Sequence, residues 1–439
     1  MSIRCRGFAK APVLVVFLDF YDRESSFFPS ELKRSQATPN SPARKRLAMK
    51  TKFDVIVLGL GAMGSATIYQ LARRKRKVLG IDQFSPPHDY GSTHGESRII
   101  RQAIGEGEEY TPLSLRSYEL WREIERETGK ELLTITGGLI LQRRASETKL
   151  HGQHDFLGQT IACAQKFNIR HEVLETGDVK NRYPQFAVTE ETAYFEYDTG
   201  YLRPEPCVSA QLNLAEKYGA MIRLNQKVSS ITPHQNTHVR VATESAVYEA
   251  EQLVIAAGAW VTKFLPPAYA RFFKVYRQVM YWFRVRDDSR RAFAPGKFPI
   301  FIWISEAERD FGFYGFPSLD ERTIKVASEQ YTLTTTPNDV NRQVTAEEKK
   351  SMYAHHLRDK LPGVSDICDA AVTCLYTTTP DANFVIDFYP GQHRIVVASP
   401  CSGHGFKHSA AIGEAIAQFV IDGKSELDIT GFRINRFKI

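Results

Sequence analysis

The sequence predicts an α/β protein, with a discontinuous Rossmann-like dinucleotide-binding domain and a second, α+β domain built on a mixed, largely antiparallel sheet. Three observations support this fold class. An apolar, β-branched run over 53–58 has the character of a buried strand. Glycines at G-x-G-x-x-G spacing follow it at once, and several later runs alternate apolar and polar residues as half-exposed strands do. At 439 residues the chain also exceeds the size at which one core keeps growing, which favours two domains.

The glycines of this fingerprint each have a mechanical role in binding a dinucleotide. Gly59 allows the tight turn after the strand, Gly61 lets the backbone approach a pyrophosphate, and Gly64 lets the next helix pack close to the strand. That helix is expected over 65–74, with its N-terminus facing the phosphates. The alternative is a glycine-rich turn in an unrelated α/β protein, and the fingerprint alone does not distinguish FAD from NAD.

Two further strands extend the nucleotide-binding pattern. A strand over 78–81 ends at Asp82, whose carboxylate can accept hydrogen bonds from ribose hydroxyls. The apolar run 253–257 leads into Gly258-Ala259-Trp260, which suits a parallel strand that returns beneath the cofactor. Without further context, the better interpretation of this second run is a buried strand that ends in a turn.

The net charge of +7 belongs to the N-terminal leader. Residues 1–52 carry 11 Lys and Arg against 4 Asp and Glu, whereas residues 53–439 carry 46 of each sign. The body of the chain is therefore neutral, which removes the electrostatic argument for a nucleic-acid partner. No apolar run reaches the roughly 18 residues needed to span a membrane. We expect neither a nucleic acid nor a membrane as partner.

Residues 1–50 form a leader that we expect to be disordered or to target the protein to a compartment. Ala11–Leu18 is a short apolar stretch behind Arg4, Arg6 and Lys10, but two aspartates follow it and no clear cleavage site does. A targeting segment and an upstream extension without structural consequence are weighted equally. The chain does not end in the usual peroxisomal tripeptide. We expect a cytoplasmic protein, with a peroxisomal location open if the chain is eukaryotic.

The cysteines indicate a reducing compartment. None of the six forms a C-x-x-C pair or a metal-ligand spacing, and six in a chain of this length do not make a disulfide framework. We therefore expect no metal site. The six are Cys5, Cys163, Cys207, Cys368, Cys374 and Cys401.

Beyond the fingerprint, the chain resembles the family of monomeric sarcosine oxidase, N-methyltryptophan oxidase and pipecolate oxidase. The resemblance runs from about residue 53 to the C-terminus, excludes the leader, and rests on blocks that occur in the family's order. These blocks are Pro86-Pro87-His88, Gly91-Ser92-Thr93-His94-Gly95-Glu96-Ser97-Arg98-Ile99-Ile100-Arg101, Lys297-Phe298-Pro299, Cys374-Leu375-Tyr376-Thr377, Thr379-Pro380-Asp381, Ser402-Gly403-His404-Gly405-Phe406-Lys407 and Phe432-Arg433-Ile434-Asn435-Arg436-Phe437.

The resemblance implies a flavoprotein in which FAD is attached covalently, through a thioether from Cys374 to the flavin 8-methyl carbon. On residue chemistry alone, a single cysteine near a strand end is more often a small buried hydrophobic residue, but the motif around Cys374 favours attachment. Attachment needs a thiolate, so we expect a cationic neighbourhood. Arg98 and His94 are the candidates to supply it.

The resemblance also implies catalytic roles for four side chains. Arg101 and Lys407 stand where the family binds a substrate carboxylate through a guanidinium and an ammonium. The alternative is a solvated surface pair, against which the apolar Ile99-Ile100 argues for Arg101. Lys297 aligns with the lysine that promotes electron transfer to oxygen. Tyr376 is expected to line the substrate cavity, and it can at the same time be a buried tyrosine with a satisfied hydroxyl.

A glycine-rich turn before a helix expected over 409–419 would direct a helix N-terminus, with Lys407, at the negative charge of a reduced flavin. The alternative is an ordinary glycine loop before a helix. The residues expected to bind the cofactor are Gly59, Gly61, Gly64, Asp82, Gln83, Ser92, Ser97, Arg98, Val228, Gly258, Cys374, Gly403, His404, Gly405, Phe406 and Lys407.

Departures from the family's pattern leave the size of the substrate pocket open. Pro400-Cys401 stands before Ser402 where relatives commonly have Gly-Phe. The aromatic residues Tyr281-Trp282-Phe283, with Phe301 and Trp303, either line a larger apolar pocket or belong to the core of a sheet. We weigh these two interpretations evenly.

The FAD-binding domain is expected to comprise 51–133, 197–265 and 373–431, and the substrate domain 134–196 and 266–372, with a tail over 432–439. Strands of the substrate sheet are expected over 275–285, 300–304, 311–316 and 323–327.

The expected function is FAD-dependent oxidation of a secondary amino acid to an imine, with dioxygen reduced to hydrogen peroxide. One alternative is a dehydrogenase that uses another electron acceptor, against which Lys297 argues. A non-enzymatic nucleotide-binding protein is the other, and the set Arg101, Lys297, Cys374 and Lys407 argues against it. We expect a monomer whose partners are a small amine and dioxygen.

Overall fold

Two large sheets organise the part of the chain that the computed structural model describes, residues 52–143, 155–234, 237–304 and 312–438. Residues 48–439 form one compact unit. The leader lies outside the described residues, so its expected role stays a prediction. Among the described residues, no helix is long and apolar enough to cross a bilayer.

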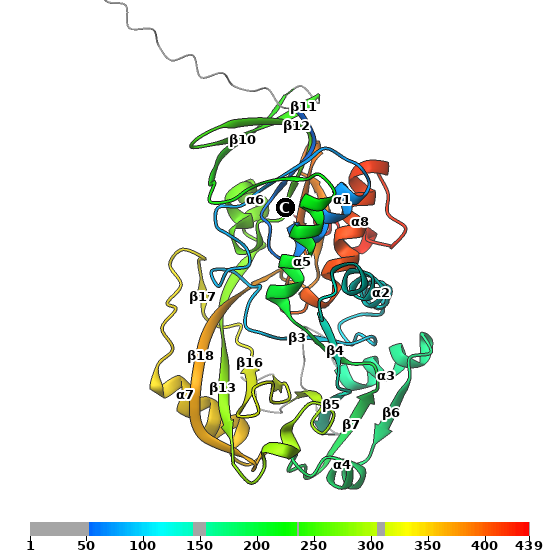
Figure 1. Ribbon diagram of the computed structural model, residues 1–439, viewed down its shortest axis with the longest axis vertical. Helices are drawn as coiled ribbons and strands as arrows, with labels where there is room; N and C mark the ends of the chain where they lie inside the picture. The colour runs from blue at the N-terminus through cyan, green and yellow to red at the C-terminus, as the bar shows by residue number, and fades with distance from the viewer. Residues whose placement is uncertain (1–51, 144–154, 235–236, 305–311, 439) are drawn as a thin grey trace, which may run out of the picture. The chain divides into compact units, whose positions relative to one another are not determined.

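The first sheet contains the glycine fingerprint (Figure 1). The predicted strands at 53–58 and 78–81 are confirmed as β1 (Lys52–Leu58) and β2 (Val78–Ile81), which pair in parallel. β12 (Val247–Ile255) lies in parallel on the other side of β1, as predicted for the run 253–257, and pairs in turn with β20 (Gln392–Ser399). The other strands are β9 (Met221–Arg223), β10 (Val228–His234), β11 (His238–Thr243) and β19 (Val385–Tyr389).

Helices pack beside this sheet because each presents a largely apolar, buried face. The predicted helices at 65–74 and 409–419 are confirmed as α1 (Ala62–Arg73) and α8 (Ser409–Asp422), which contact each other closely. α5 (Pro204–Lys217) packs on α1, and α2 (Thr111–Thr128) packs on α8 (Figure 1). A 3-10 turn, η5 (Phe406–His408), leads directly into α8.

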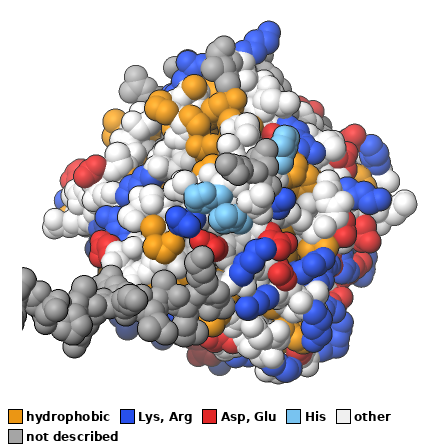
Figure 2. Space-filling model, turned by 90° about the horizontal axis from the view of Figure 1, so that it is seen from above, with side chains coloured by type: hydrophobic (Ala, Val, Ile, Leu, Met, Phe, Trp, Pro, Cys, Tyr) orange, Lys and Arg blue, Asp and Glu red, His pale blue; other side chains and the backbone are white. Residues whose placement is uncertain are grey.

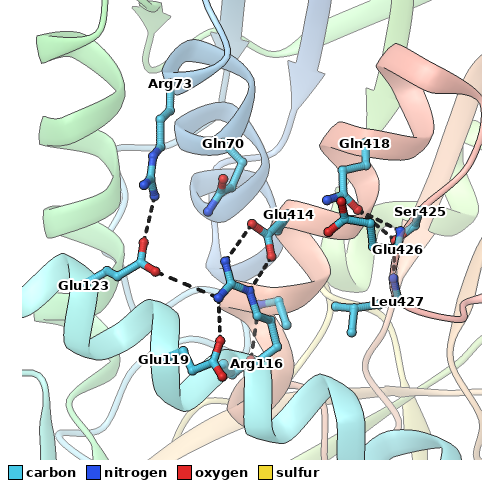
Figure 3. A network of polar contacts seen from close by, with 12 residues as sticks. Gln70, Arg73, Arg116, Glu119, Glu123, Glu414, Gln418, Ser425, Glu426 and Leu427 are labelled. Carbon is cyan, nitrogen blue, oxygen red and sulfur yellow. Dashed lines mark hydrogen bonds and ion pairs between the residues drawn. The ribbon is translucent and has the colours of Figure 1, made fainter.

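Charged side chains connect three of these helices (Figure 3). Arg116 on α2 donates to the two carboxylate oxygens of Glu414 on α8 at 2.7 and 3.0 Å, and Arg73 on α1 donates to Glu123 on α2 at 3.0 Å. Burial raises the pKa of Glu414, but the hydrogen bonds and charge of Arg116 outweigh it and hold that pKa below its usual value. The network therefore fixes α8, and with it the turn that precedes α8.

The second sheet is mixed but mostly antiparallel, as predicted. β14 pairs in parallel with β5, whereas β13 pairs antiparallel with both β16 and β18 along most of its length. The predicted strands are confirmed, although Phe311 lies outside the described residues. The strands are β5 (Gly138–Arg143), β6 (His171–Leu174), β7 (Glu191–Glu196), β13 (Lys274–Val285), β14 (Ile300–Trp303), β15 (Phe313–Gly315), β16 (Thr323–Ser328), β17 (Thr334–Thr335) and β18 (Val364–Thr378).

Smaller elements complete the described fold. A three-stranded sheet orders β3 (Arg98–Ile100), β8 (Gly200–Leu202) and β4 (Leu133–Ile135). The remaining α-helices of the described ranges are α3 (Phe156–Lys166), α4 (Thr176–Arg182), α6 (Pro267–Ala270) and α7 (Ala346–Met352).

The expected division into two domains stays a prediction. Strands of the first sheet come from the segments expected to bind the dinucleotide, and those of the second come mainly from the other segments, but β18 crosses the expected boundary at 373. Figure 2 shows basic and acidic side chains interspersed on one face of the molecule, in keeping with the neutral charge balance of residues 53–439.

Candidate active site

A large cavity opens where the parallel strands of the first sheet end. It encloses about 1410 Å³ of empty space including its mouth, and it is lined by the segments that follow β1, β2, β12 and β20. Crevices at the carboxyl ends of parallel strands are the usual ligand sites of such sheets. Its lining residues extend from the glycine loop to Tyr376 and Phe406, so the cavity suits an extended ligand.

The glycine loop at one end of this cavity has the backbone geometry that the fingerprint predicts. Gly59 has a φ of +87°, and a Cβ there would lie 2.4 Å from the carbonyl oxygen of Ala256. A Cβ on Gly64 would lie 1.7 Å from the carbonyl oxygen of Gly59. The Leu60 N–H donates to Asp82 Oδ2 at 2.7 Å, so the predicted ribose-binding carboxylate also holds the loop.

Most of the residues predicted to bind the cofactor line this cavity. Those that do are Gly59, Gly61, Asp82, Gln83, Ser92, Arg98, Val228, Gly258, Gly403, Gly405 and Phe406. Gly64 instead packs behind the loop, Ser97 is buried beside Arg98, and His404 and Lys407 line a second cavity.

The large cavity fits a dinucleotide carrying a flavin. The glycine loop and the N-terminus of α1 can receive a pyrophosphate, and Asp82 can accept from a ribose. The buried hydroxyl of Ser399 lines the cavity and has no hydrogen-bond partner among the described residues. A buried polar atom of this kind points to a ligand that satisfies it.

The second cavity adjoins the first. It encloses about 720 Å³, and Arg98, Tyr376, Gly403 and Phe406 line both cavities. Gly403 has a φ of +86°, and a Cβ there would lie 3.0 Å from the Tyr376 ring, so only glycine suits this shared wall. A molecule in the second cavity therefore lies next to whatever occupies that part of the first.

Arg101 and Lys407 are brought together in the second cavity, as predicted, and both are buried. The structure places a residue between them that the sequence did not indicate. Glu106 is paired with the Arg101 guanidinium, and its Oε1 lies 3.4 Å from Lys407 Nζ, which also donates to the carbonyl oxygen of His404 at 2.9 Å. Burial lowers the pKa of Lys407 to about 8, while Glu106 opposes that shift. Arg101 and Lys407 thus form a buried pair of cations with the carboxylate of Glu106 beside them.

Tyrosines and apolar side chains also line this cavity. Tyr376 lines it as predicted, with its hydroxyl 3.4 Å from that of Tyr314. The apolar wall consists of Phe156, Ile302 and Phe313.

Four members of the aromatic cluster, Tyr281, Phe283, Phe301 and Trp303, are core, because they are buried within the second sheet and line neither cavity. Trp282 is partly buried, donates to Glu96 Oε2 at 2.9 Å, and lines neither cavity. These observations decide between the two interpretations left open by the sequence.

Cys374 lies on β18, buried next to Met280 and Ala327, and is not itself part of the wall of either cavity. Burial raises the pKa of its thiol, and the positive charges of Arg98 and Lys325 oppose that rise. The expected positive charges near Cys374 are therefore present, but they come from Arg98 and Lys325, and not from Arg98 and His94. Burial lowers the pKa of His94 to about 4, so His94 is neutral at pH 7 and does not contribute a charge.

The structure does not bring Lys297, the lysine expected to promote electron transfer to oxygen, to either cavity. Lys297 is exposed, lies between η3 (Arg290–Phe293) and β14, and lines neither cavity. The buried lysine near Cys374 is Lys325 on β16, whose Nζ donates to the carbonyl oxygens of Gly95 and Ser97 at 2.7 and 2.5 Å. Its strand, Thr323–Ser328, also contains a threonine and a serine, so nothing in the local sequence distinguishes Lys325 from a solvated lysine.

Comparison with known proteins places the chain in a family. Residues 54–419 match the family described as FAD dependent oxidoreductase. The chain therefore belongs to the FAD-dependent oxidoreductases, and FAD is its cofactor.

The relatives of this chain indicate which FAD-dependent oxidoreductases it resembles. Monomeric sarcosine oxidase of Bacillus sp. (strain B-0618) is 36% identical over 393 residues, which covers 88% of this chain and 97% of that protein. N-methyl-L-tryptophan oxidase of Escherichia coli K12 is 32% identical over 390 residues, covering 88% and 100%. The resemblance seen in the sequence is thus confirmed. A solved structure of NikD, an unusual amino acid oxidase, matches with a TM-score of 0.75 at 23% identity over 87% of this chain and 97% of NikD, which shows the shared fold.

The lowered pKa of Lys407 predicts that carboxylate binding weakens as the pH rises through about 8. The ammonium is charged below that pKa and neutral above it, and a charge-assisted hydrogen bond contributes about 1.5–3 kcal/mol. Affinity for methoxyacetate, an acid without an amine, should fall about five- to tenfold between pH 7 and pH 9. This affinity is measured from the change in absorbance of the bound flavin as methoxyacetate is added. Lys407→Met should bind weakly at both pH values, and an equally steep decline in that variant would assign the pH dependence to another group.

Proposed function

We propose that the enzyme oxidises a secondary amino acid, either an N-methyl amino acid such as sarcosine or a cyclic one such as pipecolate. The product is an imine that water hydrolyses, and dioxygen is reduced to hydrogen peroxide. The observation that carries the proposal is the buried pair Arg101 and Lys407 in a cavity that shares a wall with the dinucleotide cavity. The names of the relatives, sarcosine oxidase and N-methyl-L-tryptophan oxidase, agree with it.

Substrate orientation follows from the positions of the charges. The substrate carboxylate competes with Glu106 for the hydrogen bonds of Arg101 and Lys407, and the C–N unit then points toward the wall made by Tyr376, Gly403 and Phe406. FAD, held by the residues that line the first cavity, would supply the two-electron acceptor. The apolar residues Phe156, Ile302 and Phe313 leave room for a substituent larger than hydrogen on the α-carbon.

The cofactor is held, in this proposal, by a thioether through Cys374. The supporting observation is its position beside Arg98 and Lys325, whose charges favour the thiolate that attachment requires. Lys325 also takes over the role first assigned to Lys297. A positive charge beside Cys374 stabilises the negative charge that develops on oxygen during its reduction. We further propose that the protein acts as a monomer.

The function is tested by a peroxide assay with sarcosine, other N-methyl amino acids, pipecolate and proline. We expect peroxide and an equivalent amount of imine-derived carbonyl product from at least one secondary amino acid. Flavin that is reduced by the amine without peroxide formation would favour the alternative dehydrogenase. A protein whose flavin no amino acid reduces would refute the proposed function.

Covalent attachment predicts that the yellow colour of the protein stays with the acid-precipitated pellet. Cys374→Ser should release all of the flavin into the supernatant, because no thioether can form. Cys401→Ser is the control, because Cys401 lines the large cavity that is expected to hold the flavin. Its replacement should leave the flavin in the pellet. The absorbance of the pellet and of the supernatant shows where the flavin is. Flavin in the supernatant of acid-precipitated wild-type protein would exclude the thioether.

Lys325→Met should slow the reaction of the reduced enzyme with oxygen by roughly 100-fold or more, the usual cost of removing one electrostatic stabiliser. Anaerobic reduction by substrate should change much less. Burial lowers the pKa of Lys325 well below its usual range, so oxygen reactivity of the wild type should fall as the pH rises through that lowered pKa. Stopped-flow absorbance separates the two half-reactions. Lys297→Met is the control and should match the wild type, and equal slowing of both half-reactions in Lys325→Met would contradict the assigned role.

A further inference from the structure

The substrate cavity contains a second carboxylate in addition to Glu106. Glu329 directly follows β16 and lines the cavity, and the Tyr331 hydroxyl donates to its Oε2 at 2.7 Å. The same hydroxyl lies 3.1 Å from where a Cβ on Gly403 would be, while the Tyr376 ring lies 3.0 Å from that point. Glu329 is therefore held at the side of the cavity where Gly403 and Tyr376 form the wall shared with the flavin cavity.

The two carboxylates have different surroundings. Glu106 contacts both Arg101 and Lys407, whereas Glu329 accepts a hydrogen bond from the neutral phenol of Tyr331. Glu329 still acts on its neighbours: burial and the negative charge of Glu329 raise the pKa of Tyr331. The titratable groups on which its charge acts from the surrounding elements are Tyr331, Tyr314, Cys374, Tyr376 and Lys407.

A secondary amino acid enters such a cavity as a zwitterion, because its amine is protonated near neutral pH. Its carboxylate has a defined place at Arg101 and Lys407. Its ammonium loses water on entry, and burying that charge without an anionic partner is costly. Glu329 lines the cavity near the wall that Gly403 and Tyr376 share with the flavin cavity.

We propose that Glu329 binds the protonated amine of the substrate and accepts its proton, and thereby selects amino acids in their zwitterionic form. One proton passes from the ammonium nitrogen to a carboxylate oxygen of Glu329, which gives a neutral amine and a neutral carboxylic acid without moving electrons. The neutral amine is the form from which two electrons can be removed. This inference rests on the proposed function and adds the residue that recognises the amine.

The test is the pH dependence of anaerobic flavin reduction by sarcosine at limiting concentration. Wild-type enzyme accepts the protonated amine, so its second-order rate constant should not rise between pH 6.5 and 8.5 and should fall about fourfold as Lys407 loses its proton. Glu329→Gln can use only the neutral amine, so the ratio of its rate constant to that of the wild type should rise about tenfold per pH unit over the same range. Glu329→Asp keeps the carboxylate and should restore the wild-type profile at a lower rate.

Two controls separate recognition of the amine from a structural role. Glu321→Gln changes an exposed glutamate just before the same strand and should give the wild-type profile. The affinity of Glu329→Gln for methoxyacetate, which has no amine, should stay within about twofold of wild type, because only the contact to the amine is lost. A large loss of methoxyacetate affinity would overturn the inference and leave Glu329 a structural residue.

The outcomes also distinguish this inference from the proposed function. Parallel pH profiles for wild type and Glu329→Gln, with the wild type reduced by sarcosine, would overturn the role of Glu329 alone. Wild-type flavin that neither sarcosine nor any other secondary amino acid reduces would overturn the proposed function, and the inference with it.

Discussion

The buried ammonium of Lys325 connects the second sheet to the loop that contains Gly95 and Ser97. It projects from β16 of the second sheet and donates to the carbonyl oxygens of Gly95 and Ser97, in the loop that closes the dinucleotide cavity. The Phe316 ring lies 4.2 Å from it. A buried ammonium must keep its acceptors, so the loop cannot move away from the sheet without a large cost in free energy. Arg98, which follows Ser97, is thereby held near Cys374 on the neighbouring part of the sheet.

This constraint explains why the two cavities meet at one wall. The loop ending at Arg98, the strand carrying Tyr376 and the turn containing Gly403 come from three distant parts of the sequence, and each contributes to both cavities. The positive charges of Arg101 and Lys407 lie on the far side of that wall from the glycine loop. In the proposed function, an amino acid held there presents its C–N bond toward the flavin and not its carboxylate, which is the orientation that oxidation needs.

Local patterns predicted the parts of the structure that depend on short-range chemistry. The β1–α1–β2 unit, its glycines and Asp82 could be predicted because backbone conformation and phosphate binding require those residues at that spacing. Lys325, Glu106 and Glu329 could not, since a charged residue in a short segment is normally solvated and only tertiary packing buries it. Lys297 was chosen from a three-residue block, which carries no information about burial, and the chain places it at the surface.

The central claim is that the carboxylate of the substrate positions its amine against the flavin. Anaerobic reduction of the enzyme-bound flavin by sarcosine, compared with reduction by sarcosine methyl ester, tests it most directly. The ester keeps the oxidisable C–N bond and removes the negative charge. The account predicts that sarcosine bleaches the flavin at least about 100-fold faster than the ester, as expected for the loss of charge-assisted bonds worth about 1.5–3 kcal/mol each. Equal rates for the acid and the ester would contradict it.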